Sequence, residues 1–184
     1  MTAADFLARW RVRLGYFLAV VLLILARPTP QAILIGGAVG LLGLGIRAYA
    51  AGFLHKQEIL TTTGPYAYTR NPLYFGSSFL ALGAAIAMRS IIGGMLLLAY
   101  FSLVYTFVMR REEQELRRKH LTGFDAYAIS VPLFFPAFSR KEPTESERGA
   151  FSWGQYKRNH EYEAAFGFVL LLIALAVIWK LRAA

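Results

Sequence analysis

The sequence predicts an all-α, polytopic membrane protein with five transmembrane helices. Of its 184 residues 57% are hydrophobic, and the mean hydropathy is +0.44. A soluble core of this size does not need so many apolar side chains, so part of them must face lipid. They are gathered in five runs in which Arg47 is the single charged residue. The chain has no cysteine, which excludes a disulfide scaffold, a zinc ribbon and a thiol nucleophile.

The five runs predict helices within one domain covering residues 1–184, near 14–25, 33–54, 73–88, 91–109 and 164–179. At about 1.5 Å per residue the second and fourth runs extend roughly 33 and 28 Å, enough to cross a bilayer, whereas the first covers about 18 Å. Extension back through the interfacial Trp10 would place Arg9, Arg11 and Arg13 at the headgroups. A cleaved signal peptide is the alternative. Because no small-residue cleavage site follows Leu25, we expect a retained helix.

The distribution of basic residues predicts the orientation in the membrane. If the N-terminus is cytoplasmic, most lysines and arginines precede the first helix or fall in two polar stretches, 55–71 and 110–163. The positive-inside rule then predicts a cytoplasmic N-terminus and an external C-terminus. The same rule accounts for the net charge of +9, so we expect membrane lipids and no nucleic acid as partners. Chemistry with a soluble cofactor is expected in the two polar stretches.

The second apolar run combines small residues with its one charge. Five small residues favour close packing against another helix: Gly36 and Gly40, which form a GxxxG pair, and Gly43, Gly45 and Ala48. Arg47 lies eight residues before His55, about 12 Å below the expected helix end. It either extends to the headgroups or points into an internal polar pocket.

The first polar stretch ends in the string Gly64-Pro65-Tyr66-Ala67-Tyr68-Thr69-Arg70-Asn71-Pro72-Leu73-Tyr74-Phe75-Gly76. Asn71 followed by Pro72 predicts a helix N-cap with proline at the first helical position. Exposed N–H groups at this helix start, together with Arg70, can receive a ligand carboxylate. Tyr66, Tyr68 and Tyr74 offer ring faces to a cationic group, although tyrosines also form interfacial belts.

The second polar stretch continues the fourth helix through Arg110-Arg111-Glu112-Glu113-Gln114-Glu115-Leu116-Arg117-Arg118-Lys119-His120. Most of these charges fit i,i+4 surface pairs, namely Arg111 with Glu115, Glu113 with Arg117, and Glu115 with Lys119. Glu112 has no basic residue four positions on. We expect Glu112 or Glu113 to turn into a site formed with the first polar stretch.

Three further features complete the second polar stretch. Pro132 and Pro136 end any helix in the apolar segment 124–136, which we expect to fold back against the membrane and wall a pocket. After a polar linker, Lys141 to Gly149, the string Ser152-Trp153-Gly154-Gln155 predicts a capping box that opens the last helix. Tyr156, Asn159 and Glu163 share a face that either closes the site or lies at the headgroups.

These motifs, in this order, resemble the isoprenylcysteine carboxyl methyltransferase and phospholipid methyltransferase family. That family has Gly-x-Tyr-x-x-x-Arg-His-Pro-x-Tyr-x-Gly after a membrane helix, then Glu-Glu, then a tyrosine-containing stretch that ends in Val-Pro and Pro. The matching residues here are Gly64 to Gly76, Glu112-Glu113, Tyr127, Val131-Pro132 and Pro136, within residues 33–136. The resemblance implies a membrane enzyme that binds S-adenosylmethionine at the cytoplasmic face and takes a lipophilic substrate from the bilayer.

The same resemblance assigns roles to single residues. Those implied in cofactor binding are Tyr68, Arg70, Asn71, Pro72, Tyr74, Gly76 and Glu113, with His55 as a looser match. Glu112, Glu113 and Arg110 are the implied catalytic residues. A carboxylate acceptor would be positioned by Arg110 or Arg47, whereas an amine acceptor would lose a proton to Glu112, Glu113 or a tyrosine.

The sequence departs from the family pattern at two positions, and its fifth membrane helix after Pro136 is a further departure. Asn71 stands where the family usually has histidine. Because of this substitution, a non-catalytic membrane scaffold remains an alternative to the enzyme. Ser130 replaces a basic residue usual in isoprenylcysteine methyltransferases, which weakens the case for a prenylcysteine carboxylate. A related membrane sterol reductase uses a nicotinamide cofactor and has glutamate after the glycine of the motif. Ser77 occupies that position here, so the methyltransferase is preferred.

Overall fold

A computed structural model describes residues 3–55, 60–137 and 150–183, and every regular element among them is helical. In chain order the elements are α1 (Ala3–Leu25), α2 (Pro30–Phe53), the 3₁₀ helix η1 (Gly64–Ala67), α3 (Pro72–Met88), α4 (Ile91–Lys119), α5 (Leu121–Ser130), α6 (Trp153–Arg158) and α7 (Tyr162–Ala183). The all-α prediction is therefore confirmed for these ranges. The expected linker from Lys141 to Gly149 lies outside the described residues.

All five expected long helices are present, with boundaries set by local capping. α1 begins at Ala3, so its extension through Trp10 is confirmed. α2 begins at Pro30 because the Thr29 hydroxyl accepts a hydrogen bond from the Ala32 N–H (3.3 Å) and proline suits the first helical position. Ser90 caps α4 in the same way, and α4 then continues without a break to Lys119.

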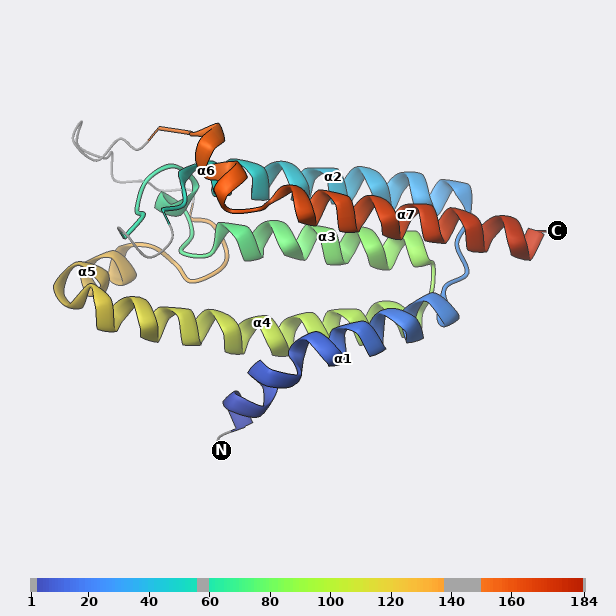
Figure 1. Cartoon of the computed structure of the whole chain (residues 1–184), viewed down its shortest axis with the longest axis horizontal. Helices are drawn as coiled ribbons and strands as arrows, with labels where there is room; N and C mark the ends of the chain where they lie inside the picture. The colour runs from blue at the N-terminus through green and yellow to red at the C-terminus, as the bar shows by residue number, and fades with distance from the viewer. Residues whose placement is uncertain (1–2, 56–59, 138–149, 184) are drawn as a thin grey trace.

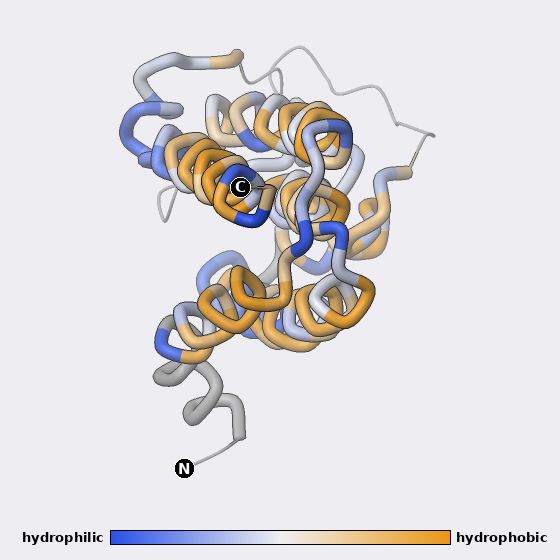
Figure 2. The backbone as a smooth tube through the Cα atoms, turned by 90° about the vertical axis from the view of Figure 1, so that its right-hand side faces the viewer, coloured by the Kyte–Doolittle hydropathy of each residue, from blue (hydrophilic) through white to orange (hydrophobic). Residues whose placement is uncertain are grey.

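Much of the surface is apolar. By length and composition, α2, α4 and α7 are each able to cross a membrane, and shorter apolar helical stretches occupy Arg13–Leu25 and Pro72–Met88. Large side chains on the long helices, such as Leu34, Leu103 and Ile173, are exposed. Figure 2 shows the hydrophobic colour spread over the bundle helices. Such a surface is that of a membrane protein, because water would not tolerate so large an apolar area.

The helices form an elongated bundle with two unlike ends. α2, α3 and α7 run side by side, and α1 lies along α4 (Figure 1). One end, called the polar end below, gathers residues 54–55 and 60–71, α5 with residues 131–137 after it, and α6. The connections α1–α2 and α3–α4 and the end of α7 lie at the other end (Figure 1). The two polar stretches thus meet at one place.

The tightest helix contact joins α2 to α3 through glycines. A Cβ at Gly43 would lie 2.6 Å from the Gly76 carbonyl oxygen, and one at Gly76 would lie 2.8 Å from the Gly43 oxygen. Gly36 faces Gly83 in the same manner, while Gly40 receives the Phe168 ring of α7. The predicted small-residue packing surface is confirmed at these positions.

Two expectations about α2 and α7 are wrong. Gly45 has no atom within 4 Å of where its Cβ would stand, so it lies off the packing surface. The Ser152 hydroxyl accepts a hydrogen bond from the Gln155 N–H (3.4 Å), as a capping residue does, but it opens the short α6 and not the last long helix. His160 then adopts a left-handed backbone (φ 56°), and the chain turns before α7 begins at Tyr162.

Candidate active site

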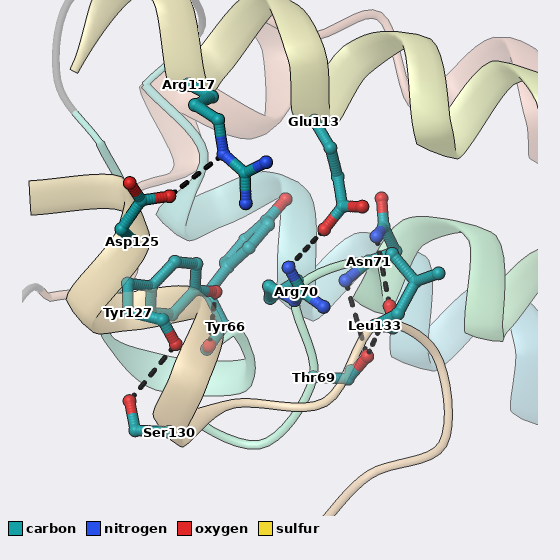
Figure 3. A network of polar contacts seen from close by, with 10 residues as sticks. All are labelled: Tyr66, Thr69, Arg70, Asn71, Glu113, Arg117, Asp125, Tyr127, Ser130 and Leu133. Atoms are coloured by element: carbon teal, nitrogen blue, oxygen red, sulfur yellow. Dashed lines mark hydrogen bonds and ion pairs between the residues drawn. The ribbon is translucent and has the colours of Figure 1, made fainter. Parts of the chain in front are cut away.

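An ion pair between Arg70 and Glu113 lies at the centre of the polar end. Arg70 stands just before α3, Glu113 lies on α4, and the guanidinium Nη1 meets the carboxylate Oε1. The two side chains are 15% and 22% exposed, so most of each is shielded from solvent. The predicted Glu113–Arg117 pair is therefore wrong. Arg117 instead pairs with Asp125 of α5 at 2.9 Å (Figure 3).

The neighbouring glutamate also contacts the first polar stretch. The Tyr74 hydroxyl donates a hydrogen bond to Glu112 Oε1 at 2.7 Å. The Tyr74 ring packs edge-on against Tyr105 of α4, with 5.1 Å between the ring centroids. Glu112 and Glu113 therefore both turn from α4 toward the motif that contains Arg70 and Tyr74.

The segment 131–137 forms a wall alongside this motif, fixed by a ladder of hydrogen bonds. The Arg70 N–H donates to the Pro132 oxygen and the Ala137 N–H to the Tyr68 oxygen, both at 2.9 Å. The Thr69 hydroxyl donates to the Phe134 oxygen at 2.9 Å. This segment was expected to wall a pocket, and the bonds place it directly against the residues around Arg70.

Asn71 differs from its predicted capping role. It occupies the N-cap position of α3, with Pro72 buried at the first helical position, but its side chain caps no helix N–H. Its amide Nδ2 donates to the Leu133 oxygen at 3.0 Å instead (Figure 3). An asparagine here therefore anchors the 131–137 wall. A sequence argument finds the cap position easily, whereas the choice of partner depends on a segment 62 residues away.

Two tyrosines are buried beside the ion pair, Tyr66 and Tyr127 (Figure 3). The Tyr127 hydroxyl donates to the Tyr66 carbonyl oxygen at 2.7 Å, while the Tyr66 hydroxyl is buried with no hydrogen-bond partner among the described residues. Burial raises the pKa of both phenols above its ordinary value. Tyr127, Glu161, Glu112 and Tyr74 raise the pKa of Tyr66 further. Both therefore remain neutral hydrogen-bond donors through the physiological pH range.

Arg47 points inward, which settles the choice between its two expected positions. Its Nη2 lies 2.7 Å from Glu161 Oε2, and its Nη1 donates to the Ser77 hydroxyl and to the Leu73 oxygen (3.3 Å). Both charged side chains are largely buried, at 18% and 7% exposure. The sequence reasoning missed Glu161. A signal was present, because a charge inside an apolar helix needs an acidic partner, and few acids lie near an apolar run.

The joint between α6 and α7 is attached to the end of α2. The Asn159 Nδ2 donates to the Ala51 and Leu54 oxygens, at 2.9 and 3.0 Å, and so satisfies carbonyls at the C-terminus of α2. Of the predicted face formed by Tyr156, Asn159 and Glu163, only Asn159 is buried. The Glu163 side chain is 71% exposed and lies beside His160.

Of the remaining predicted site residues, Gly76 and Tyr68 belong to the motif, whereas His55 and Arg110 lie apart from the residues around the ion pair. Gly76 is buried, because it faces the α2 backbone, and Tyr68 is exposed at the mouth of the motif. His55 makes local contacts, with its Nδ1 3.0 Å from the Phe53 oxygen. Arg110 is exposed, and no hydrogen bond or ion pair ties its side chain to any residue that the structure describes. The structure thus brings Arg70, Asn71, Tyr74, Glu112 and Glu113 together, but not His55 or Arg110.

Comparison with curated proteins finds two bacterial relatives. The chain is 36% identical over 114 residues to the nickel-cobalt-cadmium resistance protein NccN of Alcaligenes xylosoxydans xylosoxydans, covering 58% of this chain and 53% of that protein. It is 32% identical over 106 residues to the cobalt-zinc-cadmium resistance protein CzcN of Cupriavidus metallidurans, covering 54% and 49%. The chain therefore spans about half the length of these relatives. Among its described residues, no three His, Asp or Glu side chains are placed to hold a metal ion.

Comparison with solved structures finds no significant match. Comparison with protein families does find one. The phospholipid methyltransferase family matches residues 14–121, which include α2, α3, the motif from Gly64 to Gly76, and both glutamates of α4. This match covers more than half of the chain. The chain belongs to the phospholipid methyltransferase family.

Proposed function

We propose that this protein transfers a methyl group from S-adenosylmethionine to a lipophilic acceptor at the cytoplasmic face of the membrane. The observation that carries the proposal is the ion pair between Arg70 and Glu113, which joins two separate family motifs at the polar end. Membership in the phospholipid methyltransferase family supports methyl transfer as the reaction class. The apolar exterior supports an acceptor that arrives from the bilayer.

Unpartnered polar atoms support a polar ligand at this place. Tyr66 Oη and Arg70 Nε are buried without a hydrogen-bond partner among the described residues, whereas Glu113 Oε1 is engaged by Arg70 Nη1. Such atoms are costly to bury unless a ligand or water binds them. S-adenosylmethionine carries a carboxylate, an ammonium group and a sulfonium centre. A guanidinium, two carboxylates and tyrosine rings are matching partners, so these residues fit the cofactor.

Methyl transfer of this kind needs orientation and exclusion of water more than strong acid–base chemistry. When bound, S-adenosylmethionine supplies an electrophilic methyl group. Arg70 and Glu113 would hold and orient the cofactor, and the 131–137 wall would exclude water from it. Glu112, held by Tyr74, would accept the proton that an amine acceptor must lose.

The contacts of Arg47 favour a lipid amine over an isoprenylcysteine-like carboxylate as the acceptor. Glu161, Ser77 and the Leu73 oxygen already engage both terminal nitrogens of its guanidinium, so that Nε is the donor left to position a carboxylate. Arg110 remains the other candidate for that task, and it is exposed on α4. Two glutamates beside the motif suit proton removal from an ammonium group.

The test is calorimetric binding of S-adenosylmethionine and its demethylated product to the detergent-purified protein. We expect saturable binding that falls at least about tenfold in Arg70→Lys, which loses the planar donor fork of the guanidinium, and in Glu113→Gln, which loses the carboxylate charge. Glu115→Gln is the matched control, since Glu115 forms an exposed pair with Arg111 on the same helix.

Two results would contradict the proposal. Stabilisation by NADPH, with no binding of S-adenosylmethionine, would instead favour a nicotinamide-dependent lipid or sterol reductase. Binding of neither cofactor would favour a non-catalytic membrane scaffold. If binding is found, a screen of lipid amines and prenylated carboxylates then identifies the acceptor.

A further inference from the structure

An open groove lies at the end of the bundle opposite the polar end. It has a volume of about 720 Å³, and its lining joins Arg27 of the turn after α1 to Arg89 and Ser90 of the α3–α4 connection. Arg27, Arg89 and Ser90 line it where the helices end. Ile91, Met95 and Leu98 continue the lining along one face of α4, because positions three and four apart share a helix face. The groove is therefore polar at its mouth and apolar along its length.

No aspartate or glutamate side chain forms an ion pair with the basic residues at this end among the residues that the structure describes. Arg27 and Arg89 line the groove, and Lys180 and Arg182 lie in the last turn of α7, where Arg182 reaches the Ala26 oxygen. The sequence has no aspartate or glutamate in residues 6–57, 59–111 or 164–184. The Arg182 guanidinium donates to the Ile24 and Ala26 carbonyl oxygens. The Arg27 and Arg89 side chains are exposed, and no ion pair joins either to a residue that the structure describes.

We propose that this groove binds an anionic phospholipid. Arg27 and Arg89 hold its phosphate, and one acyl chain lies along Ile91, Met95 and Leu98. A phosphate oxygen is a suitable acceptor for guanidinium donors, and the apolar stripe matches a hydrocarbon chain in shape and polarity. An anionic headgroup fits better than a zwitterionic one, because the ammonium of a zwitterionic lipid finds no acid here. This lipid site lies at the opposite end from the proposed methyl transfer and does not depend on it.

A substitution at Arg89 can test lipid binding without destabilising the fold. Its backbone is left-handed (φ 51°), at the position after a helix where glycine is favoured. Replacing this arginine by glycine removes the charge and suits the backbone, so Arg89→Gly retains or raises the melting temperature. Arg27→Gln keeps the main-chain bond from the Arg27 N–H to the Met88 oxygen, at 2.8 Å.

The experiment titrates the detergent-purified full chain with dioctanoyl-phosphatidylglycerol, dioctanoyl-phosphatidylcholine and inorganic phosphate, and follows binding and melting temperature. We expect saturable binding of phosphatidylglycerol, about tenfold weaker in Arg27→Gln and in Arg89→Gly, because each loses a charge-assisted hydrogen bond. Arg118→Gln is the control, since it removes one exposed charge at the other end of the molecule.

Three outcomes would overturn the proposal. Equal phosphatidylglycerol affinity in Arg27→Gln, Arg89→Gly and Arg118→Gln would place the lipid elsewhere. Equal affinity for phosphatidylcholine would remove the requirement for net negative charge. Inorganic phosphate that binds as tightly as the lipid would show an anion site without the apolar stripe. None of these outcomes bears on S-adenosylmethionine binding at the polar end.

Discussion

Tyr66 carries a buried hydroxyl whose ionisation would be costly, because burial and nearby negative groups raise its pKa. In the unfolded chain the phenol loses its proton near its ordinary pKa of 10.0, while the folded chain still holds that proton. The unfolded state therefore gains relative stability as the pH rises past about 10. We expect wild-type stability to fall above that pH and to fall less steeply in Tyr66→Phe, measured as melting temperature against pH.

Two comparisons make this prediction specific to Tyr66. Tyr162→Phe removes an exposed phenol in place of a buried one and is the control variant. At neutral pH, Tyr66→Phe removes a buried hydroxyl without a partner and should cost little stability. An alkaline decline equally steep in wild type and Tyr66→Phe would disprove the assignment.

For single residues, the sequence predicts which side chains belong to the candidate site more successfully than it predicts which side chains they contact. Arg70, Tyr74, Glu112 and Glu113 could all be chosen from motif and spacing. The partner of Glu113 could not, because i,i+4 geometry on α4 offers Arg117, whereas folding brings Arg70 to the same face. The i,i+4 spacing relates residues within one helix, whereas the Arg70–Glu113 contact joins the segment before α3 to α4.

The contact between α2 and α3 depends on the absence of side chains at a few positions. At Gly43 an added methyl group would meet the Gly76 carbonyl, a backbone atom that cannot turn aside. We expect Gly43→Ala to lower the free energy of unfolding by about 1–3 kcal/mol, as overpacking does. Thermal melts in detergent measure it. Gly45→Ala, on the same helix with open space around it, should show no loss, and an equal loss in both would contradict the packing.

The α6–α7 joint is attached to α2 through the ion pair of Glu161 with Arg47. Glu161→Gln leaves the Arg47 charge largely buried without its counter-charge, so we expect a loss of about 3 kcal/mol in the free energy of unfolding. Glu163→Gln is the matched control two residues away, because its side chain is exposed. If both variants unfold at the wild-type temperature, Glu161 does not hold this joint.

The capping box at Ser152 shows why the sequence predicts a helix start better than it predicts which helix follows. Ser152 was identified as a cap from four residues, and its hydroxyl does accept the expected N–H. Whether the helix continues depends on events further on, here the left-handed turn at His160. The sequence predicts all five long helices, because an apolar run of that length is compatible with few structures other than a helix.

For the whole molecule, the orientation in the membrane is the main prediction still to be measured. The chain has no cysteine, so single cysteines can report which side each end occupies. With five spans and a cytoplasmic N-terminus, an impermeant maleimide should label Ala183→Cys in intact cells, and Glu115→Cys only after the membrane is opened. Labelling of both positions from the same side would contradict the five-span topology.

The wall at 131–137 has a consequence for how this protein can diversify. Its hydrogen bonds to the motif use its own main-chain atoms, the Pro132, Leu133 and Phe134 oxygens and the Ala137 N–H. Two of its side chains also pack inward, Val131 against Phe124 and Tyr127, and Phe134 against Phe75. Substitutions at the other wall positions leave these contacts in place, and the family match itself ends before the wall, at residue 121. Descendants of this sequence can therefore change the exposed side chains of the wall, such as Phe135, while they inherit the Arg70–Glu113 pair unaltered.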